Sequence, residues 1–221
     1  MSLINFYGKL PKKYTKNKTN NPHFKIHGIK LPAFICVSGR TGSGKTNAIV
    51  NFLSMSSGTF DEVIICCKNF NADPLYKYMK DKNPDTVSIF ENSIPPMDYF
   101  NEGKQYFVIV DDMVNEPSFK LPIQKFFKYG RKIGISCAFL TQDYFATDSF
   151  LRKNMNFLWL FPSNTKVEMN NIIRNFPFMV DYQDIIDKAI QSKKNSDGSQ
   201  PLDFINIDCI TCKVRLNFDK I

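Results

Sequence analysis

The stretch Gly39-Arg-Thr-Gly-Ser-Gly-Lys-Thr46 has the pattern G-x-x-x-x-G-K-[ST], the P-loop pattern. The apolar run at 33–38 predicts a buried strand before it, and the apolar spacing at 47–53 predicts a helix after it. In such a strand–loop–helix unit, backbone N–H groups surround a phosphate and the helix N-terminus adds partial positive charge. A glycine-rich turn that binds nothing is the alternative. Because motif and context agree, the sequence predicts a nucleoside triphosphate site.

Each part of this loop has an expected role. Gly39, Gly42 and Gly44 permit positive φ angles and a close approach of the backbone to the ligand. Lys45 is expected to reach the β- and γ-phosphates, and the Thr46 hydroxyl is expected to bind Mg²⁺. ATP and Mg²⁺ are therefore the predicted cofactors. The predicted nucleotide-binding set is the whole loop: Gly39, Arg40, Thr41, Gly42, Ser43, Gly44, Lys45 and Thr46.

The composition indicates one globular α/β domain with a basic N-terminal arm. The chain has 221 residues, 43% of them hydrophobic, and a net charge of +8. No Asp or Glu occurs before Asp61, whereas Lys and Arg are frequent there. We expect a basic arm at 1–30 and a single P-loop ATPase domain at 31–221. The arm either contacts a polyanion such as nucleic acid or is a solvated basic tail, and charge alone leaves both open.

Other classes of protein are excluded or disfavoured by the sequence. No run of 18 apolar residues predicts a transmembrane helix, and the N-terminus lacks the apolar region of a secretory signal. The six cysteines lie mostly in apolar runs, as reduced buried cysteines do. The lone C-x-x-C at 209–212 has no partner pair for zinc, and we interpret His23 and His27 as structural.

The rest of the chain alternates between predicted strands and helices. Strands are expected at 33–38, 60–67, 86–90, 105–112, 131–140 and 156–161, and a C-terminal β-hairpin within 202–218. Helices are expected at 47–53, 73–80, 118–129, 167–176 and 181–191, and a loop at 193–201. This alternation predicts an α/β fold, a three-layer sandwich with a mainly parallel central sheet covered on both faces.

The strand at 105–112 ends in a second nucleotide-site signature, Asp111-Asp112. At this position of P-loop NTPases a carboxylate holds Mg²⁺, so we assign Asp111 to the metal. The neighbouring Asp112 is expected to accept a proton from the attacking water or to orient it. The alternative is a helix N-cap that follows a strand. With the P-loop in the same chain, the catalytic interpretation is favoured.

The strand at 131–140 is the additional strand expected between the P-loop (Walker A) strand and the Asp111 (Walker B) strand. It ends at Thr141-Gln142, and we expect Gln142 to sense the γ-phosphate or position water, with Thr141 as its substitute. A turn residue is the alternative. A guanidinium can stabilise the charge of a transferring phosphoryl group, and Arg131 and Arg152 are the candidates. If either acts on a neighbouring subunit, the enzyme must be a ring.

These motifs together resemble the FtsK–HerA-type DNA-packaging ATPases of large nucleocytoplasmic DNA viruses and virophages. The resemblance covers about 34–176 and rests on the P-loop, Val108-Ile-Val-Asp-Asp-Met113, Gly130-Arg-Lys-Ile-Gly-Ile-Ser136 and Phe139-Leu-Thr-Gln-Asp-Tyr144. The P-loop is shared by many families, whereas the other three motifs in this order are more selective. Cellular relatives usually have Glu at the position of Asp112.

The resemblance implies a ring-forming ATPase that drives double-stranded DNA into a preformed capsid. It implies Lys45 and Thr46 on nucleotide and Mg²⁺, Asp111 on the metal, Asp112 on water, Gln142 as sensor and Arg131 as the trans-acting arginine. The expected partners are DNA, further copies of the chain, and a capsid or portal vertex. The expected location is the host cytoplasm, a viral factory or the virion.

Two rival functions remain open from the residues themselves. A small-molecule or nucleotide kinase would act as a monomer on a small phosphate acceptor, and a nucleotide-gated capsid-assembly protein would hardly hydrolyse ATP. A GTPase is disfavoured because no Asn-Lys-x-Asp motif follows the P-loop, and an ABC-type ATPase because no Leu-Ser-Gly-Gly-Gln-like signature occurs. DNA-stimulated turnover separates the motor from both rivals.

Overall fold

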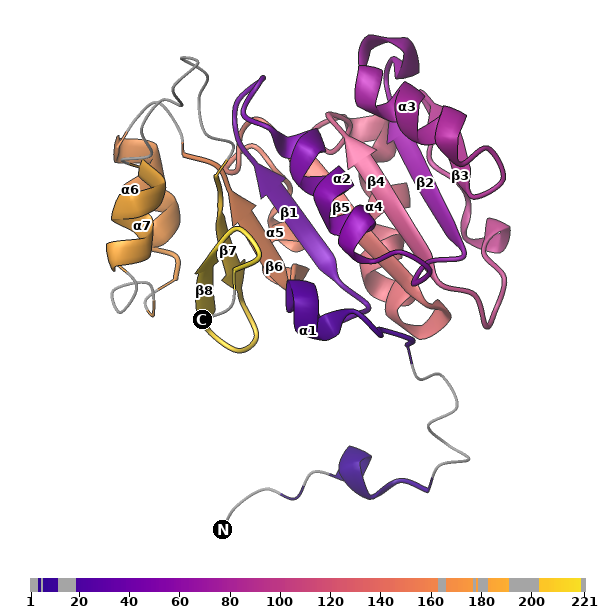
Figure 1. Ribbon diagram of the computed structural model, residues 1–221, viewed down its shortest axis with the longest axis horizontal. Helices are drawn as coiled ribbons and strands as arrows, with labels where there is room; N and C mark the ends of the chain where they lie inside the picture. Colours follow the sequence, from indigo (N-terminus) through magenta and orange to yellow (C-terminus); the bar gives the residue numbers. More distant parts are fainter. Residues whose placement is uncertain are drawn as a thin grey trace.

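Eight strands form one sheet in the order β3-β2-β4-β5-β1-β6-β7-β8. The computed structural model describes residues 4, 6–11, 19–162, 166–176, 178, 183–190 and 203–219. The strands are β1 (Phe34–Ser38), β2 (Glu62–Cys67), β3 (Val87–Glu91), β4 (Tyr106–Asp111), β5 (Ile135–Thr141), β6 (Phe157–Leu160), β7 (Ile205–Asp208) and β8 (Lys213–Leu216). The strands from β1 to β6 are parallel, so their carboxyl ends share one edge (Figure 1).

The positions of β1, β4 and β5 confirm the expected arrangement of the two nucleotide-site strands. Strand β5 pairs with β1 on one side, where Val37 lies opposite Leu140, and with β4 on the other, where Asp111 also lies opposite Leu140. It is thus the additional strand between the P-loop strand and the Asp111 strand. The antiparallel pair β7–β8 next to β6 confirms the C-terminal hairpin.

Helices cover both faces of the sheet and give the expected three layers (Figure 1). Alternate residues of β1 face opposite ways: Ile35 and Val37 join a core with the side chains of α2 (Lys45–Met55) and α3 (Pro74–Lys82). Phe34 and Cys36 join a second core on the other face. Its helices are α4 (Pro117–Tyr129), α5 (Ser149–Asn154), α6 (Lys166–Ile173) and α7 (Gln183–Ile190).

The start of β5 differs from the expectation. Residues 130–133, from which the strand was expected to begin at Arg131, form the 3-10 helix η5 (Gly130–Ile133), and the strand begins at Ile135. Gly134 has φ +78°, and a Cβ there would lie 2.4 Å from the Lys104 carbonyl oxygen. The backbone therefore turns at a position that only glycine occupies without strain, and Arg131 precedes the strand.

Several short elements were not expected from the sequence. Helices α1 (Phe24–His27) and α5, and the 3-10 helices η1 (Phe6–Lys9), η3 (Phe70–Ala72) and η4 (Met97–Tyr99), have too few residues to show a periodic pattern. The longer helices lie where they were expected; for example, Asp73 caps α3 by accepting a hydrogen bond from the Leu75 N–H at 2.8 Å. The expected loop at 193–201 lies outside the described residues.

The segment before β1 packs against the sheet. His27 and Ile29 are fully buried, and the His27 ring makes an edge contact with Phe52 of α2 at 5.0 Å. His27 Nδ1 accepts a hydrogen bond from the Ile29 N–H at 2.9 Å. Burial, with the nearby charges of His23 and Arg215, lowers the pKa of His27 to about 4. His27 is therefore a neutral core residue, as its structural interpretation requires, while an arm boundary at residue 30 stays a prediction.

Four of the cysteines are buried free thiols, as the sequence predicts: Cys36, Cys66, Cys67 and Cys137. In the part of the chain that the structure describes, no helix is both long and apolar enough to cross a membrane.

Candidate nucleotide-binding site

The P-loop lies between β1 and α2, at the sheet edge formed by the carboxyl ends of the parallel strands, which we call the carboxyl edge. The Gly39 N–H donates to the Thr141 carbonyl oxygen at 3.1 Å, which ties the loop to β5. A Cβ on Gly39 would lie 2.6 Å from Ser43 Oγ and 2.7 Å from Phe161 Cβ. Gly42 and Gly44 have φ angles of +76° and +97°. The loop therefore has the glycine-dependent backbone that a phosphate cradle needs.

The Lys45 side chain lies within this loop. Its residue is only 8% exposed, and Nζ donates to the carbonyl oxygens of Gly39 at 2.7 Å and Arg40 at 3.1 Å. Burial lowers the pKa of Lys45, while the charges of Asp112 and Asp111 oppose that change. The ammonium group is thus at the place where the β- and γ-phosphates of a nucleotide are expected.

Asp111 is the last residue of β4 and shares this edge with the loop. Its Oδ2 accepts a hydrogen bond from the Tyr76 hydroxyl at 2.8 Å. Burial raises the pKa of Asp111 to about 6; Asp112 adds to the rise, and the Tyr76 hydrogen bond and Lys45 oppose it. A carboxylate with this raised pKa gains most from a cation, because the cation compensates the lost hydration.

Asp112 and Gln142 come from neighbouring strand ends and meet in space. Gln142 Nε2 donates to Asp112 Oδ2 at 3.0 Å, and both side chains are exposed. The Asp112 backbone has φ +52°, an uncommon value for a residue other than glycine, though Asp tolerates it better than most. The structure therefore brings together the two residues that the sequence predicted as base and sensor.

Thr141, considered as the substitute for Gln142, has a different environment. It is buried, and its hydroxyl donates to the Asp143 carbonyl oxygen at 2.9 Å and lies 3.2 Å from the Thr147 hydroxyl. These bonds hold the turn after β5. Gln142 is therefore the residue at the tip of this strand that can reach a ligand.

Arg131 and Arg152 lie apart from the P-loop. Arg131 stands before β5, a strand of seven residues, so about 23 Å of extended chain separates it from Gln142. Its guanidinium lies over the Phe34 ring at 5.7 Å, while Arg152 lies over Tyr144 at 5.4 Å and donates from Nε to the Thr147 carbonyl oxygen at 3.1 Å. Both arginines line one cavity of about 630 Å³. Arg131 therefore lies too far along the strand to contact a nucleotide held by its own P-loop.

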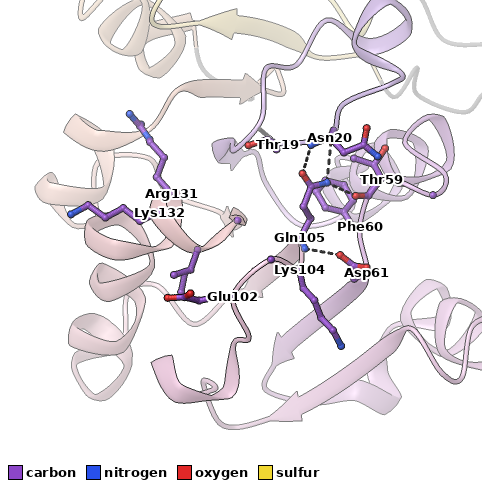
Figure 2. A pocket seen from close by; sticks show the side chains of 14 residues that line it. Thr19, Asn20, Thr59, Phe60, Asp61, Glu102, Lys104, Gln105, Arg131 and Lys132 are labelled. Carbon is purple, nitrogen blue, oxygen red and sulfur yellow. Dashed lines mark hydrogen bonds between the residues drawn. The ribbon is translucent and has the colours of Figure 1, made fainter. Parts of the chain in front are cut away.

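A second cavity, of about 500 Å³, lies at the opposite sheet edge, where the parallel strands begin (Figure 2). We call this edge the amino edge. The Gln105 side chain bonds to both the backbone N–H and the carbonyl of Asn20, and to the Thr59 carbonyl oxygen (Figure 2). Cations and carboxylates both line it, so its charge favours no ligand class; the lining includes Asp61, Glu102, Lys104, Arg131 and Lys132.

The oxygen donors at the carboxyl edge fit Mg²⁺. Among the described residues no group of three or more His, Cys, Asp or Glu side chains could hold a metal ion by itself. Protein-bound Mg²⁺ usually takes only one or two carboxylates, together with water and phosphate oxygens. The Thr46 hydroxyl and the Asp111 carboxylate both offer oxygen ligands, and Asp111 Oδ2 accepts a hydrogen bond from the Tyr76 hydroxyl. A metal at this place would therefore require the nucleotide phosphates as well.

Tyr76 is the residue of the site that the sequence analysis missed. It comes from α3, which is separated in sequence from both the P-loop and the Asp111-Asp112 pair. The residue is only 1% exposed. The sequence shows only that Tyr76 occupies an apolar position of a predicted helix. Its meeting with Asp111 depends on how α3 packs beside α2 and β3 on this face of the sheet.

A family model described as the poxvirus A32 protein matches residues 21–216. The match covers most of the chain and includes the P-loop, the Asp111-Asp112 pair and Gln142. No curated protein sequence matches this chain.

Solved structures of viral and bacterial ATPases share the fold. The chain superposes on the genome packaging NTPase B204 of Sulfolobus turreted icosahedral virus 2 in complex with ATP-γ-S, with TM-score 0.57, 12% identity and coverage of 85% and 97% of the two chains. For the DNA-packaging ATPase B204 of Sulfolobus turreted icosahedral virus the TM-score is 0.54 and the identity 13%, with coverage of 85% of this chain and 98% of that one. For ATPases 2 and 3 of EssC from Geobacillus thermodenitrificans the TM-score is 0.51 and the identity 11%, with coverage of 86% of this chain and 40% of that one. At these identities the likeness confirms the P-loop NTPase fold.

Proposed function

The chain belongs to the poxvirus A32 protein family, and we propose that it is an ATPase that drives double-stranded viral DNA into a preformed capsid. The observation that supports this most is the contact between Gln142 and Asp112 beside the P-loop. A carboxylate and an amide would then lie next to the γ-phosphate of a bound nucleotide. A protein that only bound nucleotide would not need that pair.

The loop would hold the triphosphate through its backbone N–H groups and Lys45. The Thr46 hydroxyl and the Asp111 carboxylate would hold Mg²⁺, which would neutralise charge on the β- and γ-phosphates. Support for a nucleotide comes from the loop geometry, and structures of B204 are described as complexes with ATP-γ-S and AMPPCP. The raised pKa of Asp111 is in keeping with a carboxylate that a cation completes.

Asp112 would act on the attacking water. Its carboxylate would accept the water proton, or orient the water, as the oxygen bonds to the γ-phosphorus and the bond to the β-phosphate oxygen breaks. Gln142 donates to one Asp112 oxygen, so its amide could fix the carboxylate and respond to the γ-phosphate. ADP and phosphate would be the products.

The motor would be a ring in which Arg131 stabilises the phosphate charge of the nucleotide bound by the next subunit. Arg131 lies on the side away from its own P-loop, and it shares a cavity with Arg152 and Lys153, so this face carries several cations. Double-stranded DNA is the proposed cargo, in keeping with the net charge of +8 and with the description of B204 as a packaging enzyme. The proposed location is the host cytoplasm or viral factory, with a capsid or portal vertex as docking partner.

Steady-state ATP hydrolysis tests this proposal, measured with and without long double-stranded DNA at two protein concentrations. Lys45→Ala is the matched inactive control. We expect specific turnover to rise with DNA and to rise with protein concentration as rings form. Turnover that ignores both would overturn the motor and favour the kinase, which a screen of small phosphate acceptors would then examine. Nucleotide binding with no turnover would favour the nucleotide-gated assembly protein.

A further inference from the structure

Tyr76 contacts one of the two side chains proposed to bind the metal. Its hydroxyl donates to Asp111 Oδ2 at 2.8 Å. A single buried hydroxyl of α3 therefore holds the carboxylate at the end of β4.

The direction of this bond suits metal binding. When Tyr76 donates to Oδ2 of Asp111, the other carboxylate oxygen is left for the metal or for a metal-bound water. Tyr76 is also a neutral donor, so it favours the charged carboxylate without cancelling the charge that attracts Mg²⁺.

Tyr76 is held rigidly enough to orient its partner. It is only 1% exposed and packs in the core on the α2–α3 face of the sheet. Its helix begins at an Asp73 cap with Pro74 in the first turn, which anchors the end nearest to Tyr76. A tyrosine also has only two side-chain torsions, so little freedom remains at its hydroxyl.

We propose that Tyr76 is a positioning residue for magnesium, which orients Asp111 as a ligand. This inference rests on the proposed function. Hydrogen-bond partners of metal ligands fix the ligand orientation, and their loss typically lowers metal affinity by about 10- to 100-fold. The effect of Tyr76 should therefore appear in the magnesium requirement and not in nucleotide binding without metal.

The test compares Tyr76→Phe with Tyr106→Phe. Tyr106 is an equally buried tyrosine at the other end of β4, and its hydroxyl oxygen accepts a hydrogen bond from the Asn101 N–H at 3.0 Å. Both variants lose one buried hydroxyl, but only one of them loses contact with the site. Melting in EDTA first verifies that both variants fold.

Two readouts are measured: the Mg²⁺ concentration for half-maximal ATP hydrolysis, and the Mg²⁺ dependence of the melting-temperature rise caused by ATP-γ-S. We expect Tyr76→Phe to need at least about 10-fold more Mg²⁺ in both, with ATP-γ-S binding in EDTA unchanged. Tyr106→Phe should match the wild type. In an Asp111→Asn background, the second readout should no longer respond to Tyr76→Phe, because the shared partner is lost.

The outcomes separate this inference from the proposed function. A Tyr76→Phe protein with wild-type Mg²⁺ dependence would overturn the positioning role, even if its melting temperature fell, and would leave the ATPase proposal intact. An equal shift in Tyr106→Phe would also overturn it, since the effect would then be one of packing. A wild-type protein that neither binds ATP-γ-S with Mg²⁺ nor hydrolyses ATP would overturn both.

Discussion

The carboxyl edge and the amino edge of the sheet are built in different ways. At the carboxyl edge the backbone takes positive φ angles at Gly42, Gly44 and Asp112, and two carboxylates stand next to each other. At the amino edge Gln105 uses both ends of its amide, on Asn20 and Thr59, and its backbone N–H donates to Asp61 at 2.7 Å. The amino edge therefore uses its polar groups to join segments of the chain, whereas the carboxyl edge gathers a glycine loop, the Lys45 ammonium group and two carboxylates, which suit a phosphate and a cation.

This difference shows where the fold tolerates unfavourable electrostatics. Burial and the negative charge of Asp112 both disfavour the ionised form of Asp111, so its pKa is raised to about 6. A bound Mg²⁺–nucleotide would relieve that cost, which is how a binding site gains affinity from a locally unfavourable arrangement.

The largest expected effect tests whether the two edges of adjacent subunits form one site. Arg131→Ala should lower ATP turnover by about 10³-fold, the lower end of what a trans-acting arginine supplies. Steady-state hydrolysis with Arg152→Ala as the matched control measures it. Mixing Arg131→Ala with Lys45→Ala protein should restore part of the activity, because some sites then combine an intact P-loop with an intact Arg131. No recovery on mixing would argue against a shared site.

The next effect is confined to the carboxyl edge. Asp112→Asn should lower ATP hydrolysis by about 10²- to 10⁴-fold, because the amide cannot accept a proton from water. ATP binding should stay within about two-fold of the wild type, since the P-loop and Asp111 keep their charge-assisted bonds to the nucleotide and the metal. Fluorescent-nucleotide binding and turnover are compared. Lys45→Ala should lose binding as well, and equal loss of binding in both variants would refute the division of roles.

A smaller effect concerns the pH dependence of folding on the amino-terminal side. His27 has a pKa near 4 in the folded protein and about 6.5 when unfolded, so the unfolded chain binds more protons between these values. Stability should therefore fall as the pH decreases through this window, by about 2 kcal/mol between pH 7 and pH 5. Urea unfolding measures it. A His27→Phe variant that folds should lose this contribution, and an unchanged difference between pH 7 and pH 5 would contradict it.

The last effect has the opposite sign and belongs to Asp111. Its folded pKa of about 6 lies above the unfolded value of 3.8, so the folded state holds the extra proton and stability falls as the pH rises through this window. Asp111→Asn should therefore stabilise the nucleotide-free protein at pH 7 by up to about 3 kcal/mol, measured by urea unfolding. The gain should vanish near pH 4, where Asp111 is protonated in the wild type too. Destabilisation at pH 7 would show that the charge is well compensated.

Part of the site was predictable because the P-loop is local in sequence. Eight consecutive residues carry its glycines, lysine and threonine, so the backbone conformation follows from the residues themselves. Asp112 and Gln142 were predictable by strand order, since parallel strands place their carboxyl ends together. Their hydrogen bond needed the register in which Asp111 pairs with Leu140 of β5.

Other features could not be predicted because they depend on packing between distant segments. The strand expected from Arg131 starts only at Ile135, since Gly134 must pass close to the Lys104 carbonyl oxygen. Helix α5 has six residues, too few to show a helical period. Gln105 contacts Asn20 across 85 residues of chain, and nothing in either local sequence indicates it.

The sequence by itself determined the fold class, the P-loop and the identities of the groups at the carboxyl edge, because spacing and side-chain chemistry specify them locally. Only the tertiary structure decided that Arg131 faces away from its own loop and that Thr141 is occupied by its own turn. It also decided that the Tyr76 hydroxyl donates a hydrogen bond to Asp111. Such contacts depend on how helices cross the sheet, and side-chain packing over the whole domain sets that geometry.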